Sequence, residues 1–137
     1  MKDRFFFDTN VLVYAYTKAN RDKQQKAKLL LQTSIGKIII ISAQVINEFY
    51  SVMQRNKVEH NQIKNDIFEM SKLFNISDIN FKLIKKALTI KESYHFSLWD
   101  SLIIASALQN NCTILYTEDM QHNQIIEDTL KIINPFK

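Results

Sequence analysis

Four short runs along the chain are almost entirely apolar and show no alternation of apolar and polar positions. They are RFFF at 4–7, KIIII at 37–41, TILY at 113–116 and LKII at 130–133. Runs of this length without alternation are typical of strands that are covered on both faces, as in parallel sheets. The pattern therefore predicts four buried strands.

Helical periodicity fills the segments between these strands, where apolar residues recur three and four positions apart. It predicts helices over 21–34, 43–56, 61–74, 80–93 and 97–110. The last segment is nearly all apolar, so it should pack against neighbours on several sides. Strands that alternate with helices predict an α/β fold with a mostly parallel sheet and right-handed crossovers.

Loop-forming residues are rare, since glycine and proline each occur once, at Gly36 and Pro135. Such a chain is expected to consist mostly of helices with short connections. It also lacks the glycine-rich loops that bind phosphates or dinucleotides. No repeat, linker or shift in composition divides it, so we expect residues 1–137 to form one domain.

The first predicted strand runs directly into an aspartate, in the sequence FFFDTN. In open parallel sheets, ligands bind in the crevice outside the carboxyl ends of the strands. Asp8 stands just past such an end. We therefore expect the phenylalanines to form the buried strand and Asp8 to mark the point where the chain reaches the crevice.

A second acid lies on an apolar helix face. Glu48 follows Val45 by three residues and precedes Val52 by four, so the three share one side of the predicted helix. A carboxylate buried there costs several kcal/mol unless it is paired, protonated or bound to a cation. The alternative is that Glu48 lies at the edge of the apolar stripe and reaches water.

Two further acids have ordinary local explanations. Asp100 lies in the first turn of the most apolar helix, where Ser97 and Asp100 form a capping box, and its neighbour Trp99 is expected to anchor the core. Asp119 follows the TILY strand, where Thr117 could cap a short helix. On local sequence alone, capping is the better explanation for Asp100.

All four acids are nevertheless expected at the same edge of the sheet. Carboxylates brought together repel one another, so their pKa values rise or they bind divalent cations. Oxygen ligands without a histidine or cysteine set favour Mg²⁺ or Mn²⁺ over Zn²⁺. The histidines, at positions 60, 95 and 122, form no ligand pattern.

The remaining composition indicates a cytoplasmic protein. The single cysteine, Cys112, permits no internal disulfide, which suits a reducing compartment, and it is expected to be a small buried apolar residue. Acidic residues interrupt the apolar start of the chain, and no long uncharged stretch follows. Neither a signal peptide nor a membrane span is therefore predicted.

Several segments together are similar to a known family. DTNVLVYA, INEF, FSLWDSLIIASAL, LYTEDMQHNQII and INPF occur in this order over nearly the whole chain. They resemble the PIN-domain ribonucleases, and most of all the VapC-type toxins of bacterial toxin–antitoxin systems. The one visible departure is Asn123, which stands where a glycine is common. Asparagine tolerates positive φ better than most residues do, so the departure is minor.

The resemblance implies a three-layer α/β/α sandwich and a metal-dependent endoribonuclease. Its acidic cluster, which would hold Mg²⁺ or Mn²⁺, corresponds here to Asp8, Glu48, Asp100 and Asp119. Thr9, Asn10 and Thr117 match supporting positions. The family also implies an RNA substrate, an antitoxin that covers the crevice, and a homodimer.

Positive charge is concentrated in places that could follow an RNA backbone. The chain has 18 Lys and Arg against 14 Asp and Glu, a net charge of +4. The segment KANRDKQQKAK contains Lys18, Arg21 and Lys23, and a second group lies at 82–91. For any single lysine, a solvated helix face is the simpler interpretation.

Two other functions stay open at this point. A haloacid-dehalogenase-like phosphatase would use Asp8 as its nucleophile, but that chemistry normally requires D-x-D, and Asn10 occupies the second position. A phosphorylation-receiver domain fits less well still. A non-catalytic RNA- or partner-binding module, in which the acids only cap helices, belongs to a different class.

Overall fold

A six-stranded sheet forms the centre of the computed structural model, which describes residues 3–137. Its order is β3-β2-β1-β4-β6-β5. Neighbouring strands are parallel except for the antiparallel pair β5 and β6. The strands are β1 (Arg4–Phe7), β2 (Ile38–Ser42), β3 (Asn75–Ser77), β4 (Ile114–Tyr116), β5 (Ile125–Ile126) and β6 (Leu130–Ile133).

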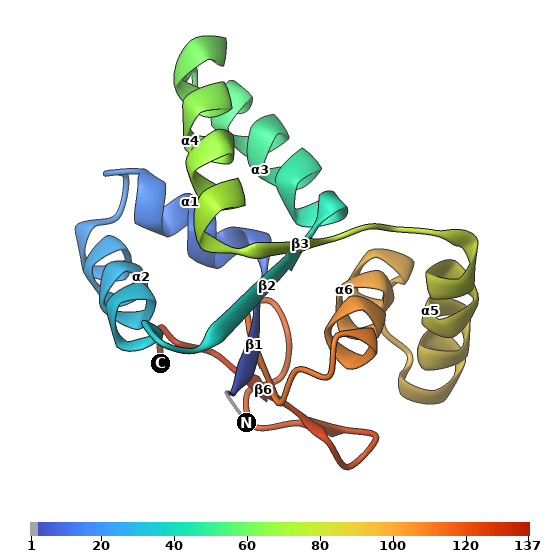
Figure 1. Cartoon of the computed structure of the whole chain (residues 1–137). Helices are drawn as coiled ribbons and strands as arrows, with labels where there is room; N and C mark the ends of the chain where they lie inside the picture. The colour runs from blue at the N-terminus through green and yellow to red at the C-terminus, as the bar shows by residue number, and fades with distance from the viewer. Residues whose placement is uncertain (1–2) are drawn as a thin grey trace.

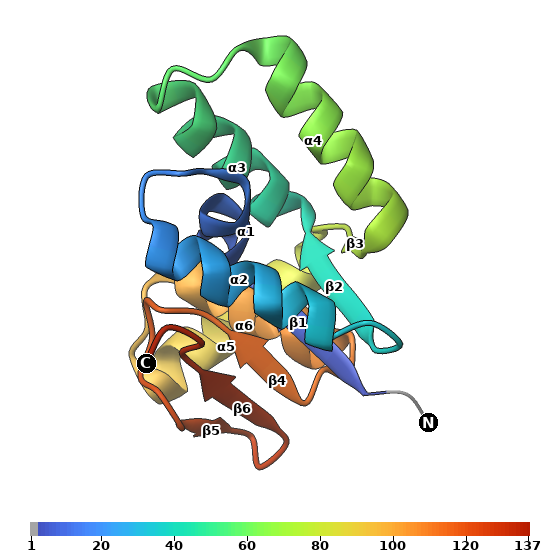
Figure 2. The same cartoon turned by 90° about the vertical axis from the view of Figure 1, so that its left-hand side faces the viewer.

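Helices cover both faces of this sheet. Helix α2 lies in front of it in the view of Figure 2, and α5 and α6 lie behind it. Helices α3 and α4 pack together and extend beyond the sheet (Figure 1). The helices are α1 (Thr9–Tyr16), α2 (Arg21–Thr33), α3 (Ala43–Arg55), α4 (His60–Leu73), α5 (Phe81–Tyr94) and α6 (Leu98–Gln109). The predicted α/β sandwich with a mostly parallel sheet is confirmed.

The four predicted strands and five predicted helices are present, and their ends differ by at most one residue from those expected. Three elements were not predicted. Helix α1 is short, apolar and rich in valine, so it lacks the polar face that reveals a surface helix. Strands β3 and β5 have three and two residues, and pairing with their neighbours defines them.

The core is built around the strand that precedes Asp8. Phe6 and Phe7 are fully buried, and β1 pairs with β2 on one side and with β4 on the other. The Phe7 ring packs edge-on against Phe74, at a centroid distance of 6.1 Å, and against Tyr116, at 5.6 Å. This burial fixes where the chain leaves the sheet and therefore where Asp8 lies.

Two smaller expectations can be compared with the structure. Cys112 is buried, as predicted, and burial raises the pKa of its thiol to about 12. No helix in the described part of the chain is long and apolar enough to cross a membrane.

Truncation of a buried side chain in the central strand β1 should lower the stability of the protein. We expect Phe7→Ala to lower the free energy of unfolding by about 3–5 kcal/mol, because it leaves a cavity among Phe74 and Tyr116. Phe68→Ala is the matched control, since Phe68 is 58% exposed on α4, and it should change stability by less than about 0.5 kcal/mol. Urea denaturation of both variants measures the difference, and equal effects would contradict this description of the core.

Candidate acidic site

Asp8 occupies the junction between β1 and α1. Its side chain caps α1, with Oδ1 accepting the backbone N–H of Thr9 at 2.7 Å. Oδ2 accepts the hydroxyl of Thr117 at 2.8 Å, and the Asp8 N–H donates to the carbonyl of Tyr116. The residue is only 5% exposed. Tyr116 and Thr117, at the end of β4, thus hold Asp8 in place directly after β1.

Glu48 of α3 contacts Thr9, the residue that follows Asp8. Helix α3 begins directly where β2 ends, with Ser42 as its N-cap. One carboxylate oxygen of Glu48 accepts the Thr9 hydroxyl at 2.9 Å, and the other accepts the Gln44 amide at 2.8 Å. Glu48 is half-buried at the edge of the apolar face. Its carboxylate is therefore held by two donors rather than left to solvent.

Asn10 links Asp119 to the same junction. Its amide nitrogen donates to Asp119 Oδ2 at 3.1 Å and to Thr117 Oγ1 at 3.2 Å, and its Oδ1 accepts the N–H of Glu118. The Thr117 hydroxyl oxygen also accepts the N–H of Asp119. Residues 118–120 form bends, so the short helix considered for this segment is not present. Thr117 instead connects two of the acids.

Asp100 approaches from the first turn of α6. Ser97 caps this helix by accepting the Asp100 N–H at 3.1 Å, as the capping box predicts. The prediction that Trp99 anchors the core is wrong, because its side chain is 64% exposed. Trp99 points outward near the N-cap, while the residues from Ser101 to Ala107 are buried.

Asp8 and Asp100 each lie within electrostatic range of Glu48 and Asp119. Burial raises the pKa of Asp8 to about 7, opposed by the hydrogen bonds from Thr117 and Thr9, and the charges of Glu48 and Asp119 raise it further. Burial also raises the pKa of Asp100, with the charge of Asp119 as the next cause and that of Glu48 as a smaller one. Asp8 and Asp100 therefore both feel the same two carboxylates.

The donor chemistry at this junction fits a hard divalent cation. Four carboxylates come from four different elements, and neutral donors support three of them. Within residues 3–137, however, no three Asp, Glu, His or Cys side chains already converge as a metal site. The four as metal ligands remain a prediction.

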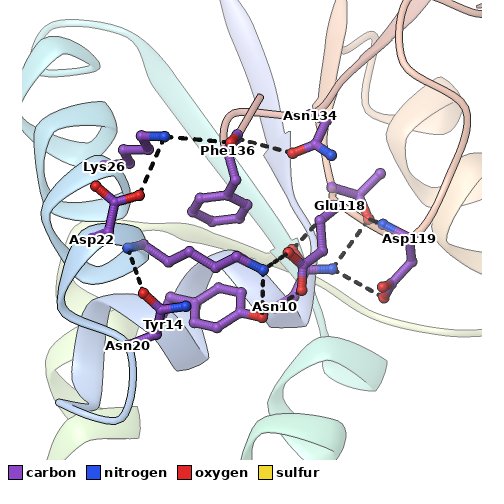
Figure 3. Close-up of polar contacts among 11 residues, drawn as sticks. Asn10, Tyr14, Asn20, Asp22, Lys26, Glu118, Asp119, Asn134 and Phe136 are labelled. Carbon is purple, nitrogen blue, oxygen red and sulfur yellow. Dashed lines mark hydrogen bonds and ion pairs between the residues drawn. The ribbon is translucent and has the colours of Figure 1, made fainter.

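Glu118 has a different role from its neighbour Asp119. It accepts hydrogen bonds from Tyr14 at 2.6 Å and from Lys23 at 2.8 Å. The Lys23 ammonium also lies 4.8 Å from the centre of the Tyr14 ring and 5.7 Å from that of Phe136. Figure 3 shows Asn10 between Glu118 and Asp119, whose carboxylates point in different directions. Glu118 thus connects the segment after β4 to α1 and α2, and Lys23 extends this contact to Phe136 of the C-terminal segment.

This arrangement separates the three predicted RNA-contacting cations. Lys23 is engaged in the contact with Glu118, and its side chain is partly covered. Lys18 is exposed in the connection between α1 and α2, and Arg21 is exposed at the first residue of α2. Lys18 and Arg21 are consequently the better placed of the three to meet a phosphate.

The TEDMQHN and INPF segments are joined by hydrogen bonds. His122 Nδ1 accepts the N–H of Asn134 at 2.9 Å, and Asn134 Oδ1 accepts the N–H of Phe136 at 2.9 Å. Asn123 adopts φ of 70°, the conformation expected for a position that glycine often fills. His122 therefore supports the C-terminal segment.

Sequence reasoning missed Gln44, which is 6% exposed and lies one turn before Glu48. Its amide nitrogen donates to Glu48 and also to the carbonyl of Trp99, at 3.2 Å, and so connects α3 with the start of α6. The only signal in the sequence was its place four residues before an unusual acid. Glutamine on a helix surface is common, so that signal is weak.

Comparison with known proteins identifies the family of this chain. The PIN domain family model matches residues 5–127, so the chain belongs to the PIN domain family. The predicted resemblance to this family is confirmed. No curated protein matches the sequence.

Solved structures with a similar fold include toxins of toxin–antitoxin systems. The sarcin–ricin-loop-cleaving toxin VapC20 of Mycobacterium tuberculosis aligns with a TM-score of 0.69 at 16% identity, over 84% of this chain and 89% of that one. A toxin–antitoxin complex from Klebsiella pneumoniae aligns with 0.68 at 20%, over 95% and 96%. VapBC2 of Rickettsia felis, bound to promoter DNA, aligns with 0.64 at 22%, over 96% and 99%.

The raised pKa of Asp8 predicts an unusual pH dependence of stability. A carboxyl group whose pKa is about 7 when folded and 3.8 when unfolded favours the folded state at low pH. In EDTA, this contribution should disappear between pH 4 and 7, a loss on the order of 4 kcal/mol. Asp8→Asn removes the titrating group, so it should remove this loss and make the variant the more stable protein at pH 8.

Urea denaturation of both proteins in EDTA from pH 4 to 8 measures this difference. The control is Asp128→Asn, in the turn between β5 and β6, which should follow the wild type. If Asp8→Asn is the less stable protein at pH 8, the Asp8 carboxylate is a structural cap rather than a member of a repelling group.

Proposed function

We propose that this protein is a metal-dependent endoribonuclease that hydrolyses RNA phosphodiester bonds, and that it acts as the toxin of a toxin–antitoxin pair. The observation that carries the proposal is the hydrogen-bonded network in which Thr9, Asn10 and Thr117 hold the acids Glu48, Asp119 and Asp8 at the carboxyl edge of a PIN-domain sheet. The pKa values of Asp8 and Asp100, which the charges of Glu48 and Asp119 help to raise, agree with this grouping. Acids that only capped their own helices would have no reason to lie close to one another.

The proposed residues divide into ligands and supports. Asp8, Glu48, Asp100 and Asp119 would hold Mg²⁺ or Mn²⁺, which would activate a water molecule and neutralise charge on the leaving oxygen. Thr9 and Thr117 hold carboxylate oxygens of Glu48 and Asp8, respectively. Asn10 and Gln44 restrict Asp119 and Glu48 in the same way. These donors limit the directions from which the acids can contact a cation.

Charge supports RNA as the substrate. With the four acids of the site set aside, 18 basic side chains stand against 10 acidic ones. Exposed Lys18 and Arg21 provide cations that no salt bridge in the described structure engages. Excess positive charge outside a small acidic site would attract a polyanion, while the acids would remain available to hold a cation.

The fold comparisons support the biological role. VapC20 is a toxin that cleaves the sarcin–ricin loop, and the Klebsiella pneumoniae structure is a toxin–antitoxin complex. By analogy, we propose that this chain acts on RNA in the cytoplasm as a homodimer and is held inactive by an antitoxin.

The competing phosphatase function has less support. Its general acid would stand at position 10, where the amide of Asn10 is engaged with Thr117, Asp119 and the N–H of Glu118. An amide in this position cannot donate a proton to a leaving group. A non-catalytic module remains the alternative that experiment must exclude.

Cleavage of RNA should depend on both metal and acids. Purified protein in Mg²⁺ or Mn²⁺ is expected to cut a mixture of single-stranded and structured RNAs, and EDTA should stop it. Asp8→Asn and Asp100→Asn should each lose about 100-fold or more in rate, a typical loss when a group that stabilises the transition state is removed. Gel analysis of end-labelled RNA measures the rates.

Asp128→Asn is the matched control and should cut at the wild-type rate. Cleavage that survives EDTA would reject the proposal. Release of phosphate from a small aryl phosphate, without RNA cleavage, would favour the phosphatase.

Production of the protein alone should stop bacterial growth if it acts as a toxin. Induction of the wild type or of Asp128→Asn is expected to arrest growth, and induction of Asp8→Asn at equal protein level should not. Colony counts after induction measure the effect. Equal growth of all three strains would contradict the toxin role while leaving the RNA-cleavage proposal standing.

A further inference from the structure

Trp99 is the most unusual exposed residue of the chain. It is the only tryptophan, it immediately precedes Asp100, and 64% of its surface is exposed. Tryptophan combines a large apolar surface with a flat ring, so an exposed tryptophan beside a charged site commonly has something to contact. Its position at the first turn of α6 is fixed by the cap that also fixes Asp100.

An open cavity of about 590 Å³ lies beside this ring. Trp99 and Leu102 of α6 form one wall, and Ile79 and Ile84 add to the apolar surface. Asn47 and Glu48 of α3 form its polar end. Because Glu48 belongs to both, the cavity is continuous with the acidic site.

Gln44 joins the cavity to the acids. It lines the cavity while its amide nitrogen donates to Glu48 and to the carbonyl of Trp99. Its Oε1 is buried and has no hydrogen-bond donor among the described residues. A buried acceptor without a partner is unusual and costly, which marks this wall as adapted to more than packing.

We propose that this cavity binds one unpaired nucleobase of the RNA substrate, stacked on Trp99, next to the bond that is cut. The inference rests on the proposed nuclease function and assigns a substrate subsite to it. The Asn47 side chain supplies both an amide donor and a carbonyl acceptor at the polar end, as the edge of a base requires. The apolar side chains opposite provide the surface for the ring faces.

Charge favours a nucleobase over a second copy of this chain. A two-fold contact centred on Trp99 would bring the Asp100 and Glu48 carboxylates of each copy toward those of the other, at a cost in repulsion. A base is neutral, and its phosphates can meet cations nearby. Helix α5, which supplies Ile84 to the cavity, carries exposed Lys82 and Lys85.

Fluorescence offers a direct test because Trp99 is the only tryptophan. The probe is a short single-stranded oligoribonucleotide of mixed sequence, titrated in Mg²⁺ into the Asp8→Asn protein, which should not cut it. Stacking should quench Trp99 fluorescence, and an abasic oligomer with the same sugar–phosphate backbone should not quench it. Absence of quenching by the complete RNA would overturn the proposal.

Affinity provides the second readout. On the same Asp8→Asn background, Trp99→Ala should weaken binding of the labelled oligoribonucleotide about 5- to 150-fold, the usual effect of losing one stacked base. Trp99→Phe should recover part of it, and Trp99→Leu, which is apolar without a ring, should not. Phe68→Ala, the exposed aromatic of α4, is the control and should bind normally.

The oligomeric state tests the alternative that a second copy of this chain occupies the cavity. Sedimentation should give the same mass for Trp99→Ala and its parent. A change from dimer to monomer with unchanged RNA affinity would show that the surface contacts a second copy and would overturn the nucleobase assignment. Because binding is measured without cleavage, failure of the nuclease proposal would appear separately, as quenching by RNA in the Asp8→Asn protein while the wild type cuts no RNA.

Discussion

The burial of one carboxylate governs this structure. Strand β1 is apolar and central, so the chain can leave the sheet only at Asp8, and the core holds that residue almost out of water. Ionisation there is costly, as its raised pKa records. The side chains of Thr9, Thr117 and Asn10 lie around this point. Their hydroxyl and amide groups form a hydrogen-bond network that includes the carboxylates of Asp8 and Glu48.

Parallel topology explains how acids so distant in sequence share one place. Strands β1, β2 and β4 all end at the same edge, and Asp8, α3 and Asp119 follow from those ends. The cap of α6 brings Asp100 to the same edge. A capping role therefore does not exclude the proposed catalytic role: Ser97 fixes the backbone that presents Asp100, and Asp8 itself caps α1. The site is assembled from helix starts and strand ends rather than from one motif.

Much of this could be predicted from the sequence, for physical reasons that also explain the failures. Long periodic segments and unbroken apolar runs specify helices and buried strands, and a carboxylate after FFF is visible without a structure. Helix α1 was missed because an apolar, valine-rich helix has no polar face, and β3 because its three residues are defined by pairing with β2. The exposure of Trp99 could not be predicted, since composition suggests burial and only the orientation of α6 decides it. Gln44 gave too weak a signal because glutamine is common on helix surfaces.

The proposed function requires that four acids tolerate one another because a divalent cation can join them. Calorimetric titration of Mn²⁺ into the metal-free protein, and into its Asp8→Asn and Asp100→Asn variants, tests this most directly. The account predicts saturable binding to the wild type that is strongly weakened in each variant, although the two residues lie on different elements. Binding that is absent from the wild type, or unchanged in both variants, would contradict it.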